Sequence, residues 1–185
     1  MAFSKVGDAE LLRAATEVFR SHGFESATLK LLSDATGLEK ASLYHRFPGG
    51  KEEIAIAVAE RVNAWFVENV FEPLKAQGTP AKRVRHVGQK LQEFYGDGMK
   101  SCTLDTLSLP GRSDELAKIL KEGLLGWLDA FAQIAKESGC TMAAARTRAE
   151  QAVVELEGSL VLSRVLGQNS LFLKLIERLP LLLLR

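Results

Sequence analysis

Side chains that could carry out catalysis are few and scattered in this sequence. The three histidines, His22, His45 and His86, do not have the spacing of metal ligands. We find no phosphate-binding glycine loop, no nucleophile elbow and no paired-carboxylate motif. Glu155 and Glu157 are two residues apart, so they cannot share one face of a helix. The sequence therefore predicts a protein that is not an enzyme and that needs no metal or cofactor.

The two cysteines are too few for a disulfide framework. Cys102 follows Ser101 at the expected start of a short helix, where the helix N-terminus would stabilise a thiolate. Cys102 is therefore a candidate thiol sensor. The alternative, which we favour, is a small buried apolar residue, because cysteines outside disulfides are often buried. Cys140 suggests no function.

Composition places the chain among ordinary globular proteins. It has 185 residues, of which 46% are hydrophobic and 25% charged. No signal peptide is recognisable, and no apolar run approaches the 18 residues of a membrane span, so we expect a cytoplasmic protein without membrane contact. The net charge is +1. Any binding of nucleic acid must therefore depend on where the basic residues lie rather than on their number.

Helical periodicity dominates the sequence, and no alternating strand pattern of useful length is present. We predict an all-α protein of about nine helices. Gly23 is expected to end the first helix, Thr28 to cap the second, Pro73 to end the long fourth helix, and Leu179 to end the last. The remaining helices are expected at about 39–47, 79–96, 102–109, 113–139 and 142–166.

A helix-turn-helix pattern lies between Leu12 and Val58. Two short helices are joined by a turn at Gly37, where glycine permits the backbone conformation of a sharp bend. Four apolar residues can hold the two helices at a fixed angle: Leu32, Ala35, Leu38 and Leu43. In this motif the second helix enters the major groove of DNA.

These residues resemble a known family. The string Ala15…Phe19…Gly23-Phe24…Thr28…Ala35-Thr36-Gly37-Leu38…Ser42-Leu43-Tyr44-His45-Arg46-Phe47, followed by Lys51-Glu52, is similar to the DNA-binding domain of TetR-type transcriptional repressors. The resemblance covers about fifty residues. It implies a DNA-binding domain at 1–50 and a ligand-binding and dimerisation domain at 51–185. The Phe-Pro-Gly-Gly-Lys-Glu turn is most like that of the multidrug-responsive subgroup.

The resemblance also implies which residues contact DNA. Thr28 would cap the second helix and touch phosphate, Tyr44 would contact phosphate, and His45 would face the groove. Glu39 departs from the small residue usual in the family, and Leu31 from a polar one, which leaves the operator sequence open. The full predicted set is Thr28, Lys30, Lys40, Ser42, Tyr44, His45, Arg46 and Lys51. Taken singly, the lysines could be solvated surface residues, and Tyr44 a core aromatic with an exposed hydroxyl.

The last two helices carry apolar stripes that suggest a dimer interface. A seven-residue repeat runs along the helix at 142–166. The resemblance implies that it forms a four-helix bundle with the final helix and the same pair of a second subunit. The predicted interface residues are Val153, Leu156, Leu160, Leu171, Leu175 and Leu179. The alternative is that these stripes face only the core of the monomer.

Aromatic and methionine side chains between the two regions are candidates for a ligand pocket: Trp65, Phe66, Phe94, Met99, Trp127 and Phe131. More commonly, such residues simply form part of the hydrophobic core. Together these features predict a ligand-responsive homodimeric repressor that leaves a palindromic double-stranded operator when an unknown, largely apolar small-molecule inducer binds. The alternative is a helical ligand- or partner-binding protein without DNA-binding activity.

Overall fold

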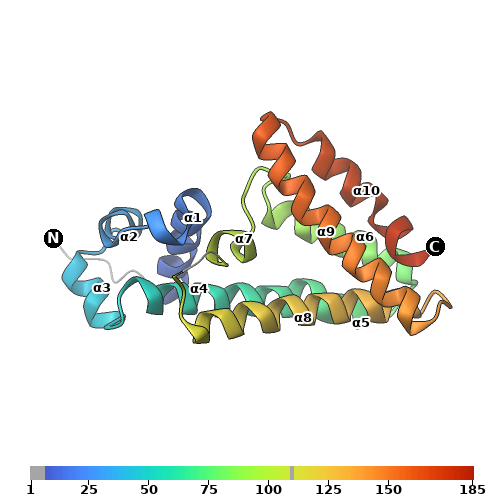
Figure 1. Ribbon diagram of the computed structural model, residues 1–185, viewed down its shortest axis with the longest axis horizontal. Helices are drawn as coiled ribbons and strands as arrows, with labels where there is room; N and C mark the ends of the chain where they lie inside the picture. Colours follow the sequence, from blue (N-terminus) through green and yellow to red (C-terminus); the bar gives the residue numbers. More distant parts are fainter. Residues whose placement is uncertain (1–6, 109–110) are drawn as a thin grey trace. The chain divides into compact units, whose positions relative to one another are not determined.

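The computed structural model describes residues 7–108 and 111–185. Within these ranges every regular element is a helix, which confirms the predicted all-α class (Figure 1). None of the described helices combines the length and apolarity needed to cross a membrane.

The chain divides into two compact units. The first comprises the residues up to Asn63 together with Thr103–Lys121, and the second comprises Ala64–Cys102 and Glu122–Arg185. The division falls inside α4 and inside α8, so each of these helices contributes to both units. This packing division differs from the predicted functional boundary at residue 50, which remains a prediction.

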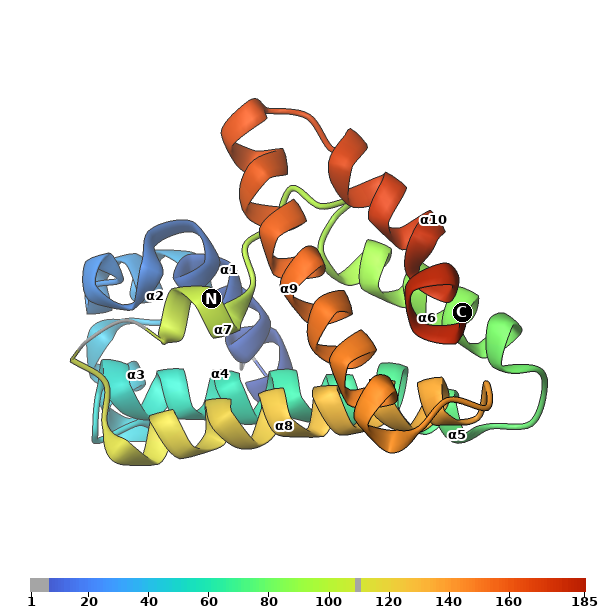
Figure 2. The same cartoon turned by 45° about the vertical axis from the view of Figure 1, so that its right-hand side comes forward.

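The first unit holds the short N-terminal helices (Figure 2). They pack on a core that includes Leu11, Phe19, Leu32, Leu43 and Ile54, each at most 1% exposed. Gly23, at φ 70°, interrupts α1 where the sequence predicts its end. The helical segments of this unit are α1 (Asp8–Ser26), α2 (Leu29–Thr36), α3 (Lys40–Arg46), α7 (Thr103–Leu107) and the first parts of α4 (Lys51–Phe66) and α8 (Asp114–Lys136).

In the second unit, α10 packs against both α9 and α6 (Figures 1 and 2). The core of the second unit includes Trp127, Phe131, Leu156 and Phe172, each at most 1% exposed. Besides the ends of α4 and α8, this unit contains η1 (Val67–Phe71), α5 (Glu72–Lys75), α6 (Pro80–Phe94), α9 (Met142–Leu166) and α10 (Ser170–Leu184).

Two helices continue past their predicted ends at Pro73 and Leu179, and each contains a proline. The fourth helix runs past Pro73 to Lys75 through the π-helix η1, in which the Glu72 N–H donates to the carbonyl of Val67, five residues earlier. This wider turn accommodates a proline that lacks an N–H and would clash in a regular α-helix. The last helix passes Pro180 and ends at Leu184, because Leu183 beyond the proline is buried in the core.

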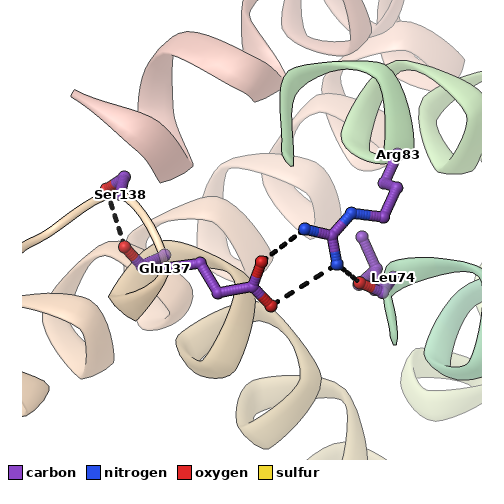
Figure 3. Close-up of polar contacts among 5 residues, drawn as sticks. Leu74, Arg83, Glu137 and Ser138 are labelled. Carbon is purple, nitrogen blue, oxygen red and sulfur yellow. Dashed lines mark hydrogen bonds and ion pairs between the residues drawn. The ribbon is translucent and has the colours of Figure 1, made fainter. Parts of the chain in front are cut away.

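Arg83 joins three helical segments of the second unit. It lies on α6, is 9% exposed, and donates to the carbonyl of Leu74 in α5 and to the carboxylate of Glu137 just after α8 (Figure 3). A buried guanidinium must be paired, since an unpaired buried charge is strongly destabilising. The pairing therefore fixes the ends of α5 and α8 against α6.

Gly98 allows α10 to approach the turn that follows α6. It adopts φ +90°, and a Cβ there would lie 2.5 Å from both Cβ and Cγ of Phe172. We expect Gly98→Ala to lower the free energy of unfolding by about 2–4 kcal/mol, through overpacking and backbone strain together. Urea denaturation measures this change.

Gly96→Ala is the matched control, because Gly96 also has positive φ, at +54°, but a Cβ there would meet only the flexible chain of Lys100. Gly96→Ala should lower the free energy of unfolding by only about 1 kcal/mol. Equal losses in the two variants would contradict the close approach of Phe172.

Candidate nucleic-acid interface and aromatic cluster

The turn between α2 and α3 is built as the sequence predicts. The hydroxyl of Thr28 accepts from the N–H of Leu31, 3.2 Å away, and so caps α2. Gly37 adopts the left-handed conformation, with φ 68°. Ser33 closes the bend, since its hydroxyl donates to the carbonyl of Leu38 at 2.5 Å. The direction in which α3 leaves α2 is therefore held by local bonds.

One side of α3 is anchored and the other is open. Leu43 is 1% exposed, whereas Lys40, Ser42, Tyr44 and His45 are all exposed. Thr28 and Lys30, at the start of α2, are exposed as well. By helical spacing, His45 lies opposite Leu43, Ser42 and Tyr44 flank Leu43 on either side, and Lys40 lies one turn before it. The unit thus presents hydroxyl, phenol, imidazole and ammonium groups, which are donors suited to phosphate and base edges.

Tyr44 is neither a core aromatic nor fully free in space. Tyr44 is 50% exposed. Its Cε1 lies 3.7 Å from the point where a Cβ on Gly50 would stand, so the ring lies close to the turn before α4. Gly50 itself has φ +66°, and this turn is held by a bond from the Gly49 N–H to the carboxylate of Glu53 at 2.7 Å. The ring is thereby placed beside this turn while half of the residue remains exposed.

Two of the predicted basic DNA contacts have partners within the protein. Arg46 pairs with Asp8 at 3.3 Å in an exposed ion pair. Lys51 donates to the carbonyls of Phe24 and Glu25, at 2.8 and 3.2 Å, and lies over the Phe24 ring. An ammonium at these carbonyls stabilises the C-terminal end of α1. Lys51 therefore has a structural role that the sequence did not indicate.

Five of the six predicted pocket residues come together in the second unit. Trp65 stacks on Phe94 with ring centroids 4.1 Å apart, and Phe66 lies 5.5 Å from Phe94 and 4.8 Å from Trp127. Phe131 lies 5.9 Å from Trp127. We call Trp65, Phe66, Phe94, Trp127 and Phe131 the aromatic cluster. Met99 is 44% exposed and makes no ring contact among the described pairs. The mutual packing fits the core alternative as well as a pocket wall.

A separate open groove of about 540 Å³ lies on the first unit, and no predicted pocket residue lines it. Its lining residues are Phe47, Gly49, Glu52, Glu53, Ile56, Ala57, Glu60 and Glu115.

The structure does not favour Cys102 as a thiol sensor. Cys102 is 3% exposed, and its sulfur lies 3.4 Å from the hydroxyl of Tyr95. The helix after it, α7, has only five residues. A buried thiol reacts slowly with reagents in solution, so the alternative of a small buried residue describes this position better.

The predicted dimer residues lie mostly inside the protomer, which corrects that assignment. Five of the six are at most 6% exposed: Val153, Leu156, Leu160, Leu175 and Leu179. Only Leu171 is exposed, at 37%. The seven-residue repeat marks the face of α9 that is buried within the protomer. The apolar stripe predicted to form the dimer interface therefore faces the core of the monomer, which is the alternative stated in the sequence analysis.

A second apolar face of α9 is exposed, and the sequence analysis missed it. It is formed by Val154, Val161, Leu162, Val165 and Leu166, which are 42–76% exposed. We call these residues the α9 outer face. Gly158 lies in the same register, and a Cβ there would meet nothing within 4 Å. Such a contiguous exposed apolar stripe is typical of a protein interface.

Comparison with known proteins identifies the domain that carries the exposed α3 face. Residues 11–58 match the family described as "Bacterial regulatory proteins, tetR family". The HTH-type transcriptional regulator LmrA of Bacillus subtilis (strain 168) is 25% identical over 185 residues, covering 95% of this chain and 96% of LmrA. Residues 11–58 of this chain therefore form a TetR family domain.

Solved structures show that the TetR family fold extends over the whole chain. A TetR transcriptional regulator from Legionella pneumophila superposes with a TM-score of 0.84 at 16% identity, covering 99% of this chain and 100% of that one. The regulator FadR from Bacillus subtilis, solved in complex with stearoyl-CoA, gives a TM-score of 0.71 at 19% identity, covering 96% and 98%. The family matched by residues 11–58 consists of regulatory proteins, and LmrA is a transcriptional regulator, in agreement with the prediction that the chain is not an enzyme.

Proposed function

We propose that this protein is a cytoplasmic homodimeric repressor of the TetR family that binds a palindromic operator through α2 and α3. The observation that supports the proposal most strongly is that α3 buries Leu43 against the first unit and exposes its own polar side chains. The proposed DNA-contacting residues are Thr28, Lys30, Lys40, Ser42, Tyr44 and His45. Arg46 could join them by exchanging its exposed pair with Asp8 for a phosphate, at small cost.

Lys51 contributes less to the proposed interface than the family resemblance implies. Two of its three N–H donors already bond backbone carbonyls of α1. We assign it chiefly to holding α1 against the start of α4, with at most one donor for the DNA backbone.

The α9 outer face supports the proposed homodimer. A repressor that reads a palindrome needs two recognition helices related by twofold symmetry. A symmetric interface pairs the same patch on both subunits, and this patch is apolar and continuous along one helix. Gly158 within it permits close approach of a second helix.

The aromatic cluster supports response to a largely apolar ligand. Trp65 and Phe66 end α4, the helix that starts directly after the turn following α3. A ligand that inserts beside them would displace α4, and with it the spacing of the two recognition helices. For release to follow, the ligand must bind the DNA-incompetent state more tightly. In this scheme residues 1–50 read DNA and residues 51–185 bind ligand and partner.

A gel-shift titration over a salt series tests this function. The DNA is the region upstream of the protein's own gene, with an unrelated fragment as competitor. We expect sequence preference and a steep fall of affinity with salt, because phosphate contacts release counterions. Lys40→Ala should reduce the slope of log affinity against log salt concentration by about one per subunit. Lys82→Ala, which removes an exposed lysine of α6, should leave it unchanged. Equal binding to both fragments would refute the proposal.

A further inference from the structure

Trp127 carries a buried hydrogen-bond donor that the packing of the aromatic cluster does not use. The residue is 1% exposed, and its indole Nε1 has no hydrogen-bond acceptor among the described residues. Buried indole N–H groups normally have a partner. Leaving such a donor unpaired costs about 1–3 kcal/mol. An apolar residue of similar size would avoid that cost, so the donor is a candidate for a binding role.

The surroundings of Trp127 are aromatic on several sides. Phe66 lies 4.8 Å away with its ring tilted by 54°, and Phe131 lies 5.9 Å away in an edge-to-face arrangement. The neighbouring Gly126 provides room for Phe71, because a Cβ there would lie 3.1 Å from Cε2 of that ring. Phe71 ends the π-helix η1, which follows Phe66 directly. Aromatic side chains of this kind offer apolar contacts to an aromatic ligand, and π-turns often accompany functional sites.

We propose that Trp127 selects the ligand: a flat, largely apolar molecule carrying a hydrogen-bond acceptor, such as a carbonyl oxygen, that accepts from the indole Nε1. The aromatic cluster supplies affinity through apolar contact, and the single donor fixes the orientation. This inference rests on the proposed ligand response, and it adds the chemical class of the ligand and the residue that recognises it.

The test uses two probes of nearly equal shape, 2-acetylnaphthalene and 2-isopropenylnaphthalene. The first has a carbonyl where the second has a carbon–carbon double bond, so only the first can accept from Trp127. Calorimetric titration of the full-length protein without DNA gives the two dissociation constants. We expect the ketone to bind about 5–10-fold more tightly, the ratio expected for one net hydrogen bond.

Trp127→Phe keeps an aromatic ring and removes the donor. The ratio of the two dissociation constants should fall to within about twofold, even if the smaller ring changes both affinities. Trp65→Phe is the matched control, because it removes an indole from the same cluster whose nitrogen is not a buried unpaired donor. Trp65→Phe should weaken the binding of both probes by a similar factor and so preserve the ratio of their dissociation constants. Thermal unfolding confirms that each variant is folded.

A ratio near one in the wild type, binding of neither probe at millimolar concentration, or a preference that survives Trp127→Phe would overturn the inference. Release of operator DNA is measured separately. If the preference depends on Trp127 but the ketone releases no DNA, the inference stands and the proposed ligand-driven release fails.

Discussion

Replacing Tyr44 with alanine is expected to lower operator affinity about 100-fold while leaving the homodimer intact. The phenol is half exposed on α3, and its ring is oriented over the turn at Gly50. Loss of one hydrogen bond to a charged phosphate costs about 1.5 kcal/mol. A dimer loses two, so the total of about 3 kcal/mol corresponds to about 100-fold. Fluorescence anisotropy with labelled operator measures the affinity.

Tyr44→Phe separates the hydroxyl from the ring. It keeps the contact with the turn and removes only the phosphate donor, so most of the loss should remain. Sedimentation should give the wild-type mass for both variants, because Tyr44 does not contribute to the buried core. Affinity of Tyr44→Ala within threefold of wild type would show that α3 does not face DNA as proposed.

Introducing charge on the α9 outer face is expected to convert the dimer to a monomer. Leu162 and Val165 are 51% and 76% exposed in the protomer, so Leu162→Glu combined with Val165→Glu leaves the monomer's own core unchanged. In a symmetric dimer each change appears twice, and four carboxylates would be desolvated in one interface, at several kcal/mol each. We expect at least a 1,000-fold weaker dimer by analytical ultracentrifugation, with operator affinity falling in parallel.

Leu125→Glu is the control for this experiment. Leu125 is a large apolar residue on α8, 40% exposed, outside the α9 outer face. Its replacement should leave the mass and the operator affinity near wild type. A double variant that still sediments as the wild type would place the dimer interface elsewhere.

The features predicted best from sequence are those fixed by local chemistry. Gly37 forms the bend because glycine adopts positive φ at little cost, and Thr28 caps α2 because its hydroxyl reaches a backbone N–H. These two residues position α3, so the exposed set around Tyr44 could be found without coordinates.

Features that depend on which surfaces become covered were predicted less well. α9 carries apolar residues on two faces, and the repeat alone could not show that Leu156 and Leu160 are buried within the protomer while Val161 and Val165 stay exposed. The predicted helix ends at Pro73 and Leu179 were wrong, since a π-turn and the burial of Leu183 outweigh the local preference of proline. The bond from Lys51 to the end of α1 joins segments 27 residues apart, which no local pattern reports.

Hydroxyl-radical footprinting of the upstream fragment that the protein shifts in the gel tests whether two α3 helices contact the operator together. Two α3 helices held by a twofold dimer should protect two patches on one side of the duplex, with centres about one helical turn, or a multiple of it, apart. We expect this paired pattern for the wild type and its loss in Tyr44→Ala. A single protected patch, or a pattern unchanged in Tyr44→Ala, would contradict it.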